Sequence, residues 1–445
     1  NIISRDRDFV IDRIFSRSKT NYLFDAEVYN SINHDLAEAA SISQSYDPYE
    51  HFARHGAWEN RPVVREEHVA SILAQISKSY ESLKNGFLRQ FAQSQLISDK
   101  HIKFIREEFV TIILHSQANH FMRPIAHALA NALVQAGVRT QICDENADGV
   151  EHATTPIIIA PHEFFTFKLP IKLDRYALIR KSILFNTEQI GSPWFSSIMG
   201  VIFGSRGVID INFQSSEVFK KSNIPSCYVL PPIDRRLRNV FLAENNGQHP
   251  LFSWIRSNVK SDGFPDRPYS DRDLDLFFAG NKTFLRTRTI AKSAPYLASR
   301  NCFISYTDSP PSTIPTDDTS ILLFSGYMNI VSNTKLVLAL PRYSIGYFEW
   351  ERFVAQGFAN GACVIASNPL KSPFFEPDIN YVDAPLRNLS SYLKWLLETR
   401  DGADSAQAII DTSRQVLEEE MSPTRVGNFI VSFLSSLDKD QSDDF

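Results

Sequence analysis

The 445-residue sequence contains no long apolar run. Its longest runs, "PIIIA" at 156–160 and "ILLF" at 321–324, are far shorter than the roughly 20 residues that a membrane-spanning helix needs. Both runs predict short buried strands. The net charge is −5 and the hydrophobic fraction is 43%, which fits neither a basic nucleic-acid-binding protein nor a disordered chain. We therefore expect a globular protein of two or three domains that binds no nucleic acid.

Cysteine is scarce, and none of the cysteines forms a CxxC pair. The four residues are widely separated in the chain: Cys143, Cys227, Cys302 and Cys363. This usage favours a reducing compartment and argues against a structural zinc site. The chain also opens without the charged, apolar and small-residue regions of a secretory signal peptide. We expect a cytosolic protein, with the inner face of the membrane as an alternative location.

The pattern of apolar residues changes along the chain. Residues 1–100 read as short amphipathic helices with aromatic anchors, in which Asp47-Pro48 should begin a helix and Gly56 should end one. From about residue 104 the pattern becomes strand (109–116), helix (123–137) and strand (138–145), and strands continue to residue 234. Such βαβ units imply a parallel sheet. After a polar stretch at 243–271, which we interpret as a linker, the alternation restarts at 274–280.

This organisation predicts an α/β protein with two Rossmann-like domains that face a cleft, preceded by a helical module. The expected boundaries are 1–100 for the module, 101–255 for the first α/β domain, 256–420 for the second, and 421–445 for a returning helix and acidic tail. Ligands of parallel sheets bind beyond the carboxyl ends of the strands, so the loops after the strands are where a site is expected.

The segment "GYFEWERFVAQGFANGACVIAS" at 346–367 should form a helix followed by a buried strand. At helical spacing, Glu349, Arg352 and Gln356 form a single polar stripe. If the helix begins near Gly346, its N-terminal amides would favour a phosphate, and Glu349 could bind sugar hydroxyls. The alternative is a solvated Glu349–Arg352 pair, worth less than about 1 kcal/mol.

The segment "GNKTFLRTR" follows the strand predicted at 274–280. Lys282 and Arg286 are four residues apart and should lie on one helix face, where a diphosphate could accept charge-assisted hydrogen bonds. The segment is not a P-loop, because Asn281 separates Gly280 from the lysine. On this interpretation an Arg286→Ala variant would lose activity and remain folded. An exposed basic helix face is the alternative.

Two segments of the first α/β domain offer a general base. In "HSQANHF" at 115–121, His115, Asn119 or His120 should lie at the end of the first strand, and histidine suits proton transfer near neutral pH. Glu188, at the end of another strand, is the competing candidate. Each of them could instead be a structural hydrogen-bonding residue.

The segment "DRDLD" at 271–275 contains an Asp-x-Asp pattern that some sugar transferases use to bind a metal ion. In those enzymes the acidic pair follows an apolar strand, whereas here it precedes one. We interpret the segment as a surface turn, and we expect no metal site.

Several of these segments resemble one family in their order along the chain. "FVAQGFANGACVIAS" at 353–367 is similar to the donor-binding helix–Gly–strand segment of GT-B glycosyltransferases with a group 1, family 4-like C-terminal domain. Gln356 stands where that family has its second Glu, and the earlier Glu aligns near Glu349 with a shift of one residue. "SILFNTEQ" at 182–189, "DLFFAGNKTFLRTR" at 275–288 and the helical module resemble GT-B transferases of bacterial surface-polysaccharide loci.

The resemblance implies a glycosyltransferase that moves a sugar from a nucleotide-sugar donor to a hydroxyl of a glycan or lipid-linked glycan, without a metal or other cofactor. His120 or Glu188 would act as the base. The expected donor-binding residues are Gly280, Lys282, Arg286, Tyr343, Glu349, Arg352 and Gln356. Two rival functions are a sugar-nucleotide epimerase of the same architecture and an inactive adaptor. With any of these three functions, the helical module could dock a protein partner or a membrane surface.

Overall fold

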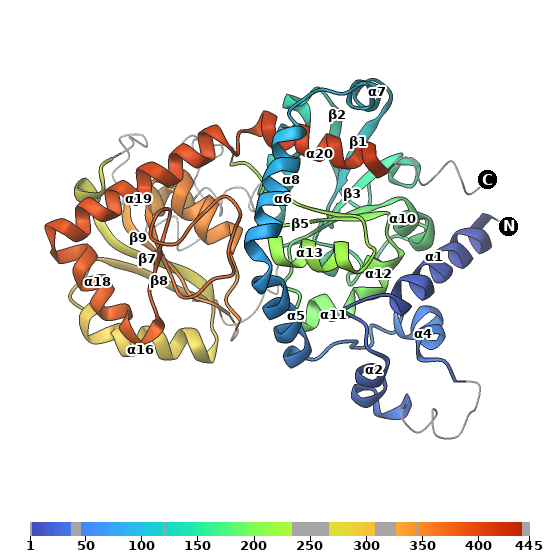
Figure 1. Ribbon diagram of the computed structural model, residues 1–445, viewed down its shortest axis with the longest axis horizontal. Helices are drawn as coiled ribbons and strands as arrows, with labels where there is room; N and C mark the ends of the chain where they lie inside the picture. The colour runs from blue at the N-terminus through green and yellow to red at the C-terminus, as the bar shows by residue number, and fades with distance from the viewer. Residues whose placement is uncertain are drawn as a thin grey trace. The chain divides into compact units, whose positions relative to one another are not determined.

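The computed structural model describes residues 2–36, 46–119, 121–233, 267–307, 326–342 and 345–437. The chain divides into two compact units (Figure 1). Unit 1 comprises Asn1–Ala118, Ile125–Pro231 and Pro423–Phe445, and unit 2 comprises Asn119–Pro124 and Pro232–Ser422. Most of the expected linker, the run at 321–324 and the acidic tail lie outside the described residues. Within the described residues, no helix has the length and apolar character needed to cross a membrane.

Unit 1 is built on a parallel six-stranded sheet with the order β2-β1-β3-β4-β5-β6. The strands from β3 to β6 are buried along their whole length, as apolar runs predict for a parallel sheet covered on both faces. The chain order reverses between β1 and β3, so the loops after these two strands meet at a topological switch point. The strand bounds are β1 Phe109–Ile113, β2 Arg139–Cys143, β3 Thr155–Ile159, β4 Ile183–Asn186, β5 Gly207–Asp210 and β6 Ser226–Tyr228.

Short helices connect these strands, and side-chain caps fix several of their first turns. The Asp174 carboxylate accepts from two backbone N–H groups of α10, and the Ser192 hydroxyl accepts from one of α11. The amphipathic helix predicted at 123–137 is confirmed as α8. The helix bounds are α8 Met122–Gln135, α9 Pro161–Phe164, α10 Arg175–Lys181, α11 Pro193–Ser197, α12 Met199–Gly204 and α13 Phe213–Lys221, with a 3-10 turn η2 at Val150–His152.

The N-terminal segment forms α1 (Ile2–Lys19), α2 (Ala26–Ile32), α4 (Pro48–His51) and the π-helix η1 (Phe52–Gly56). Asp47 caps α4 and Gly56 is the last residue of η1, as the sequence predicts. The aromatic core of this segment joins Phe24 to Tyr29 and Phe52, with ring centroids 5.2 and 4.9 Å apart. Phe52 also contacts Phe203 of α12, so the segment packs on the sheet unit rather than standing apart.

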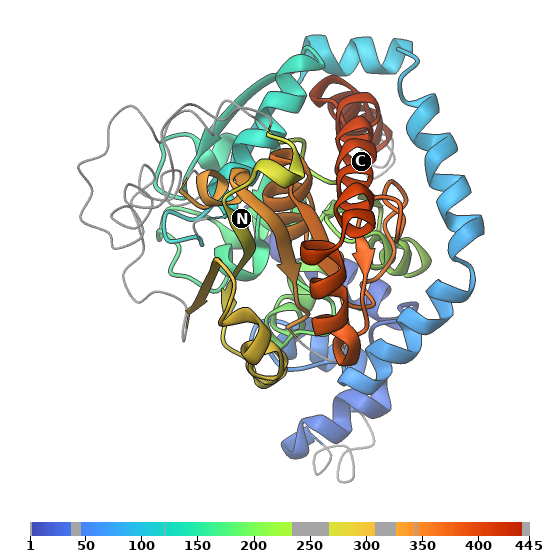
Figure 2. The same cartoon turned by 90° about the vertical axis from the view of Figure 1, so that its left-hand side faces the viewer.

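The helices α5 (Glu66–Lys78), α6 (Tyr80–Gln93) and α7 (Asp99–Glu107) follow one another with short turns (Figure 2, light blue). The C-terminal helix α20, Pro423–Leu437, packs against α7. Its Phe429 ring lies 5.2 Å from the Phe91 ring of α6, centroid to centroid. Gly427 brings α20 so close to α8 that an added Cβ would lie 2.0 Å from the Ala132 carbonyl oxygen.

Unit 2 contains a parallel five-stranded sheet with the order β11-β10-β9-β7-β8. Its switch point lies between β7 and β9, the counterpart of β1 and β3 in unit 1. The strands are β7 Leu274–Asn281, β8 Cys302–Thr307, β9 Thr334–Ala339, β10 Cys363–Ala366 and β11 Val382–Asp383. The helical elements are η4 Tyr269–Asp271, α16 Phe284–Leu297, η5 Glu351–Gly357, η6 Phe358–Asn360, η7 Leu386–Asn388, α18 Leu389–Glu398 and α19 Arg400–Glu419.

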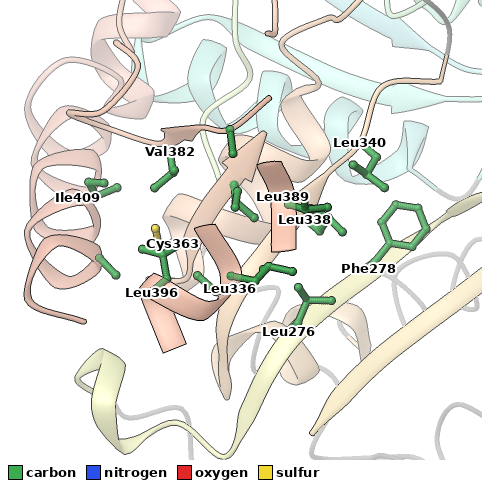
Figure 3. Close-up of a cluster of buried hydrophobic side chains, with 14 of the residues drawn as sticks. Leu276, Phe278, Leu336, Leu338, Leu340, Cys363, Val382, Leu389, Leu396 and Ile409 are labelled. Atoms are coloured by element: carbon green, nitrogen blue, oxygen red, sulfur yellow. The ribbon is translucent and has the colours of Figure 1, made fainter. Parts of the chain in front are cut away.

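Alternate residues of these strands form the core of unit 2 (Figure 3). Leu276 and Phe278 of β7 and Leu336 and Leu338 of β9 share one face of the sheet, where residues of α18 and α19 complete the cluster. The residues between them, such as Phe277, are equally buried on the other face. The two parallel sheets confirm the predicted α/β fold class with two Rossmann-like sheets.

The close approach of α20 and α8 gives a stability test. We expect Gly427→Ala to lower the free energy of unfolding by about 1–3 kcal/mol, because the new methyl group would collide with a backbone carbonyl. Gly86→Ala in α6 is the matched control, since nothing lies within 4 Å of its added Cβ. There the change should stabilise the helix by about 0.5–1 kcal/mol. Urea unfolding of both variants measures these changes. An unchanged free energy of unfolding for Gly427→Ala would contradict the close packing of α20 on α8.

Candidate active site

Two arginine side chains meet at the switch point of unit 2. Arg286 lies in the first turn of α16, which Thr283 caps by accepting the Arg286 N–H group. Arg352 lies in η5, and both side chains are almost fully buried, with exposed fractions of 2% and 5%. The helix begins at Phe284, so the prediction that Lys282 shares a helix face with Arg286 is wrong. Lys282 is an exposed residue of the loop between β7 and α16.

Arg286 donates most of its hydrogen bonds to backbone carbonyl groups at the strand ends. Its Nε and Nη2 atoms both donate to the Leu340 carbonyl oxygen, at 3.1 and 3.0 Å. Nη1 donates to the Asn281 carbonyl oxygen at 3.2 Å. Nη2 also reaches Glu349 Oε1 at 3.3 Å. The guanidinium therefore joins the carboxyl ends of β7 and β9.

Arg352 completes the arrangement from the other side. Its Nη2 donates to the carbonyl oxygen of Ala279 in β7 at 3.2 Å, and its Nη1 forms an ion pair with Glu349 Oε2. The Glu349 carboxylate is thus shared by two buried guanidinium groups. The Nε atom of Arg352 is buried and has no hydrogen-bond partner among the described residues, which leaves one donor for a further acceptor.

Gly280 makes room for both guanidinium groups. A Cβ at this position would lie 2.6 Å from Arg352 Nη2 and 3.2 Å from Arg286 Nη1. The glycine in the "FFAGNK" segment is therefore needed for close approach of the side chains rather than for an unusual backbone angle. The structure thus brings together four of the sequence-predicted residues, Gly280, Arg286, Glu349 and Arg352.

The polar stripe predicted around Glu349 differs in the structure because the segment forms a π-helix. The helix begins at Trp350 rather than near Gly346, and η5 covers Glu351–Gly357. Hydrogen bonding over five residues replaces the usual four, so that Gln356 Nε2 donates to Glu351 Oε1 at 2.7 Å. Gln356 therefore pairs with a carboxylate that the sequence analysis did not select. π-Helical turns inside helices are frequent at functional sites.

The electrostatic environment of this cluster is unusual. Burial, followed by the charge of Arg352, lowers the pKa of Arg286 to about 10, while Glu349 opposes the shift. Burial raises the pKa of Glu351 to about 7, against the opposing charge of Arg352. Arg342, just after β9, also acts on Arg286. Sequence reasoning missed Glu351, although it lies within the quoted segment at 346–367, and it missed Arg342, which lies between β9 and that segment. Tyr343 lies outside the described residues.

Unit 1 places the base candidates differently. His120 lies outside the described residues, and Asn119 is exposed. His115 is buried, and its Nε2 lies 3.6 Å from Glu145 Oε1. The Glu145 carboxylate also accepts from the backbone N–H and the hydroxyl of Ser116. These buried contacts with Glu145 and Ser116 favour a structural role for His115.

Glu188 lies two residues past the end of β4, and Asn186 fixes its backbone. The side chain of Asn186 accepts from the Glu188 N–H at 3.3 Å and donates to the Glu188 carbonyl oxygen at 2.9 Å. The same amide donates to Asp210 Oδ2 at 2.9 Å. Asp210 is fully buried, and burial raises its pKa to about 8 against the hydrogen bond from Asn186.

The loop after β3 brings His162 next to Glu188. His162 Nε2 lies 3.6 Å from Glu188 Oε2, and the Glu188 side chain is 14% exposed. Sequence reasoning missed this histidine, although it lies two residues after the quoted run "PIIIA" at 156–160. The signal was available, because the residue follows a buried strand at its carboxyl end, next to the switch point.

Comparison with known proteins gives a likeness in fold. No protein-family model matches the chain, and no curated protein does. Among solved structures, a protein described as a UDP-N-acetylglucosamine 2-epimerase from Listeria monocytogenes is 12% identical, with 75% of this chain and 97% of that chain covered and a TM-score of 0.39. An alpha-glucosyltransferase in complex with UDP is 9% identical, with 69% and 95% covered and a TM-score of 0.37.

An alpha1,3-fucosyltransferase with GDP-fucose is 8% identical, with 74% of this chain and 90% of that chain covered and a TM-score of 0.34. The descriptions of these three neighbours are those of an epimerase and two glycosyltransferases. At TM-scores below 0.5 these likenesses carry no argument about activity, donor or site residues.

The contacts of Arg286 change the expectation for its alanine variant. Arg286→Ala removes four hydrogen bonds, two to a buried acceptor and two to partly buried ones, so the free energy of unfolding should fall by about 3 kcal/mol. Arg288→Ala, two residues further along α16 and exposed, is the control and should change stability by less than about 0.5 kcal/mol. Equal unfolding midpoints in urea for the two variants would contradict the structural role of Arg286.

Asp210 predicts a pH dependence of stability. Its pKa rises on folding from 3.8 to about 8, so between these values the native state binds more protons than the unfolded state. The contribution of Asp210 to stability therefore falls as pH rises, by at most about 1.4 kcal/mol per pH unit. In urea unfolding at pH 5, 6 and 7, the stability of the wild type relative to Asp210→Asn should fall steadily. A constant difference would show that Asp210 does not bind a proton on folding.

Proposed function

We propose that this chain is a glycosyltransferase that moves a sugar from a nucleotide-sugar donor to a hydroxyl of a glycan acceptor. The observation that supports the proposal best is the position of the arginine pair at the switch point between β7 and β9. Open parallel sheets bind nucleotides at such points, and a diphosphate requires cationic donors there.

The donor would bind in unit 2. The Gly280 loop and Lys282 would lie beside the diphosphate, together with Arg342, while the buried Arg286 and Arg352 supply positive charge. Glu349 would accept hydrogen bonds from sugar or ribose hydroxyls, and Gln356 would orient Glu351. Tyr343 completes the proposed set. These cations would neutralise the leaving diphosphate without a metal ion or other cofactor.

The acceptor would react at unit 1. Its hydroxyl oxygen forms a bond to the anomeric carbon of the donor, the bond from that carbon to the diphosphate oxygen breaks, and the nucleoside diphosphate leaves with the bonding electrons. Glu188 takes the proton of the attacking hydroxyl. Its side chain is only partly buried, as access to an acceptor requires. Bacterial surface-polysaccharide synthesis on the cytosolic side of the membrane is the setting that we propose.

A donor panel tests the binding half of the proposal. We expect calorimetry to show binding of a UDP- or GDP-sugar, and Lys282→Ala to weaken it about tenfold through loss of one charge-assisted contact. Arg288→Ala, on the exposed face of α16, should leave the affinity unchanged. Absence of binding across the panel would favour the adaptor instead.

A transfer assay tests the chemical half. With a radiolabelled donor and a glycan acceptor, Glu188→Gln should lower the rate by at least about 100-fold, because the amide cannot take the proton. Donor affinity should stay within about twofold. Conversion of the donor alone to an isomeric sugar nucleotide would identify an epimerase and overturn the transferase.

A further inference from the structure

The backbone before His162 holds a conformation that L-residues rarely adopt. Ala160, the first residue after β3, has a φ of +49° and lies in the left-handed region. A non-glycine residue there costs roughly 1 kcal/mol or more, and such positions cluster at functional sites. Pro161 follows in the first position of α9, and its ring fixes the next φ angle. The turn therefore directs His162 in one orientation.

That orientation places the imidazole of His162 against the Glu188 carboxylate. The side chain is only 6% exposed, and its Nε2 lies 3.6 Å from Glu188 Oε2 and 3.9 Å from Glu163 Oε1. The edge of the Trp194 ring covers the imidazole, with centroids 6.4 Å apart. The other ring nitrogen, Nδ1, is buried without a hydrogen-bond partner among the described residues.

The unpartnered Nδ1 is informative because a purely structural buried histidine normally satisfies both ring nitrogens. A neutral imidazole has one N–H group. The nearby carboxylates accept only, so the proton belongs on Nε2, where it can be donated to Glu188. Burial lowers the pKa of His162, which keeps the ring neutral at physiological pH. Glu163 faces the same nitrogen from α9, at the longer of the two distances.

From this geometry we infer that His162 is a positioning residue: its Nε2 atom faces Glu188 from 3.6 Å, just beyond hydrogen-bond distance, and its N–H group donates to that carboxylate once the acceptor is bound, which orients Glu188 to receive the acceptor proton. The inference rests on the proposed role of Glu188 as the base. Asn186 fixes the backbone of Glu188 from β4, and His162 faces its side chain from α9, directly after β3, so the ends of two adjacent strands position one carboxylate.

The test uses the transfer assay with matched variants at residue 162. His162→Leu fills a similar volume without a donor, and we expect kcat to fall about 10- to 100-fold while donor affinity stays within about twofold. His162→Gln can place an N–H group near the position of Nε2 and should recover most of the rate. Glu163→Gln is the control for the neighbouring carboxylate and should change kcat by less than about twofold.

A double variant separates a positioning role from general damage to the fold. If His162 acts through Glu188, then His162→Leu should have almost no further effect in the Glu188→Gln background. The inference would be wrong if the fall in kcat of the double variant equalled the product of the two single-variant falls. It would also be wrong if His162→Leu alone had the kcat of the wild type. Should His162→Leu fail to fold by circular dichroism, equal rates for His162→Gln and His162→Asn, whose amide is one bond shorter, would overturn it.

The outcome for Glu188→Gln alone distinguishes this inference from the proposed function. Normal transfer by that variant would remove Glu188 as the base, and with it the role of His162. Impaired transfer by Glu188→Gln, together with fully multiplicative effects of His162→Leu, would retain the proposed base and overturn only the positioning role.

Discussion

The carbonyl groups at the carboxyl ends of parallel strands need hydrogen-bond donors once the strands are buried, and in unit 2 two guanidinium groups supply them. Arg286 and Arg352 donate to the carbonyl groups of Ala279, Asn281 and Leu340, and Glu349 offsets part of their charge. A buried cation without such partners would cost several kcal/mol. The same contacts that complete the sheet therefore place positive charge where a parallel sheet binds its ligand.

Unit 1 meets the same requirement with groups of a different kind. At the ends of β4 and β5, the amide of Asn186 and the protonation-prone carboxyl of Asp210 bond to each other and to the backbone. These groups bring little charge, and they leave Glu188 as a carboxylate beside a neutral imidazole. The fold class is shared by the two units, whereas the polar residues at the strand ends give one unit a cationic site and the other an acidic one.

Several strands could be predicted from the sequence because the central strands of each sheet are buried on both faces, so runs such as those of β3 and β4 are almost continuously apolar. The order of the strands in each sheet could not be predicted, because no local sequence pattern indicates which strands are neighbours. Strand β11, with two residues, gives no periodic signal. The π-helix was also hidden, because a 3.6-residue period was assumed for a segment whose hydrogen bonds span five residues. That single difference separates Gln356 from Glu349 and pairs it with Glu351.

The residues of the arginine cluster were selected from the sequence by type, but their partners were not, and the partners decide what an arginine can do. A guanidinium whose donors bond to backbone carbonyls acts on a diphosphate mainly through its charge. The cluster contains three arginines (Arg286, Arg342 and Arg352) and two glutamates (Glu349 and Glu351). Glu351, with a pKa of about 7, is only partly ionised near neutral pH. The cluster thus keeps a net positive charge in surroundings that water screens weakly. In the proposed donor site, direct contacts would then fall to the less buried cations Lys282 and Arg342, so donor affinity and fold stability would depend on different residues of one cluster.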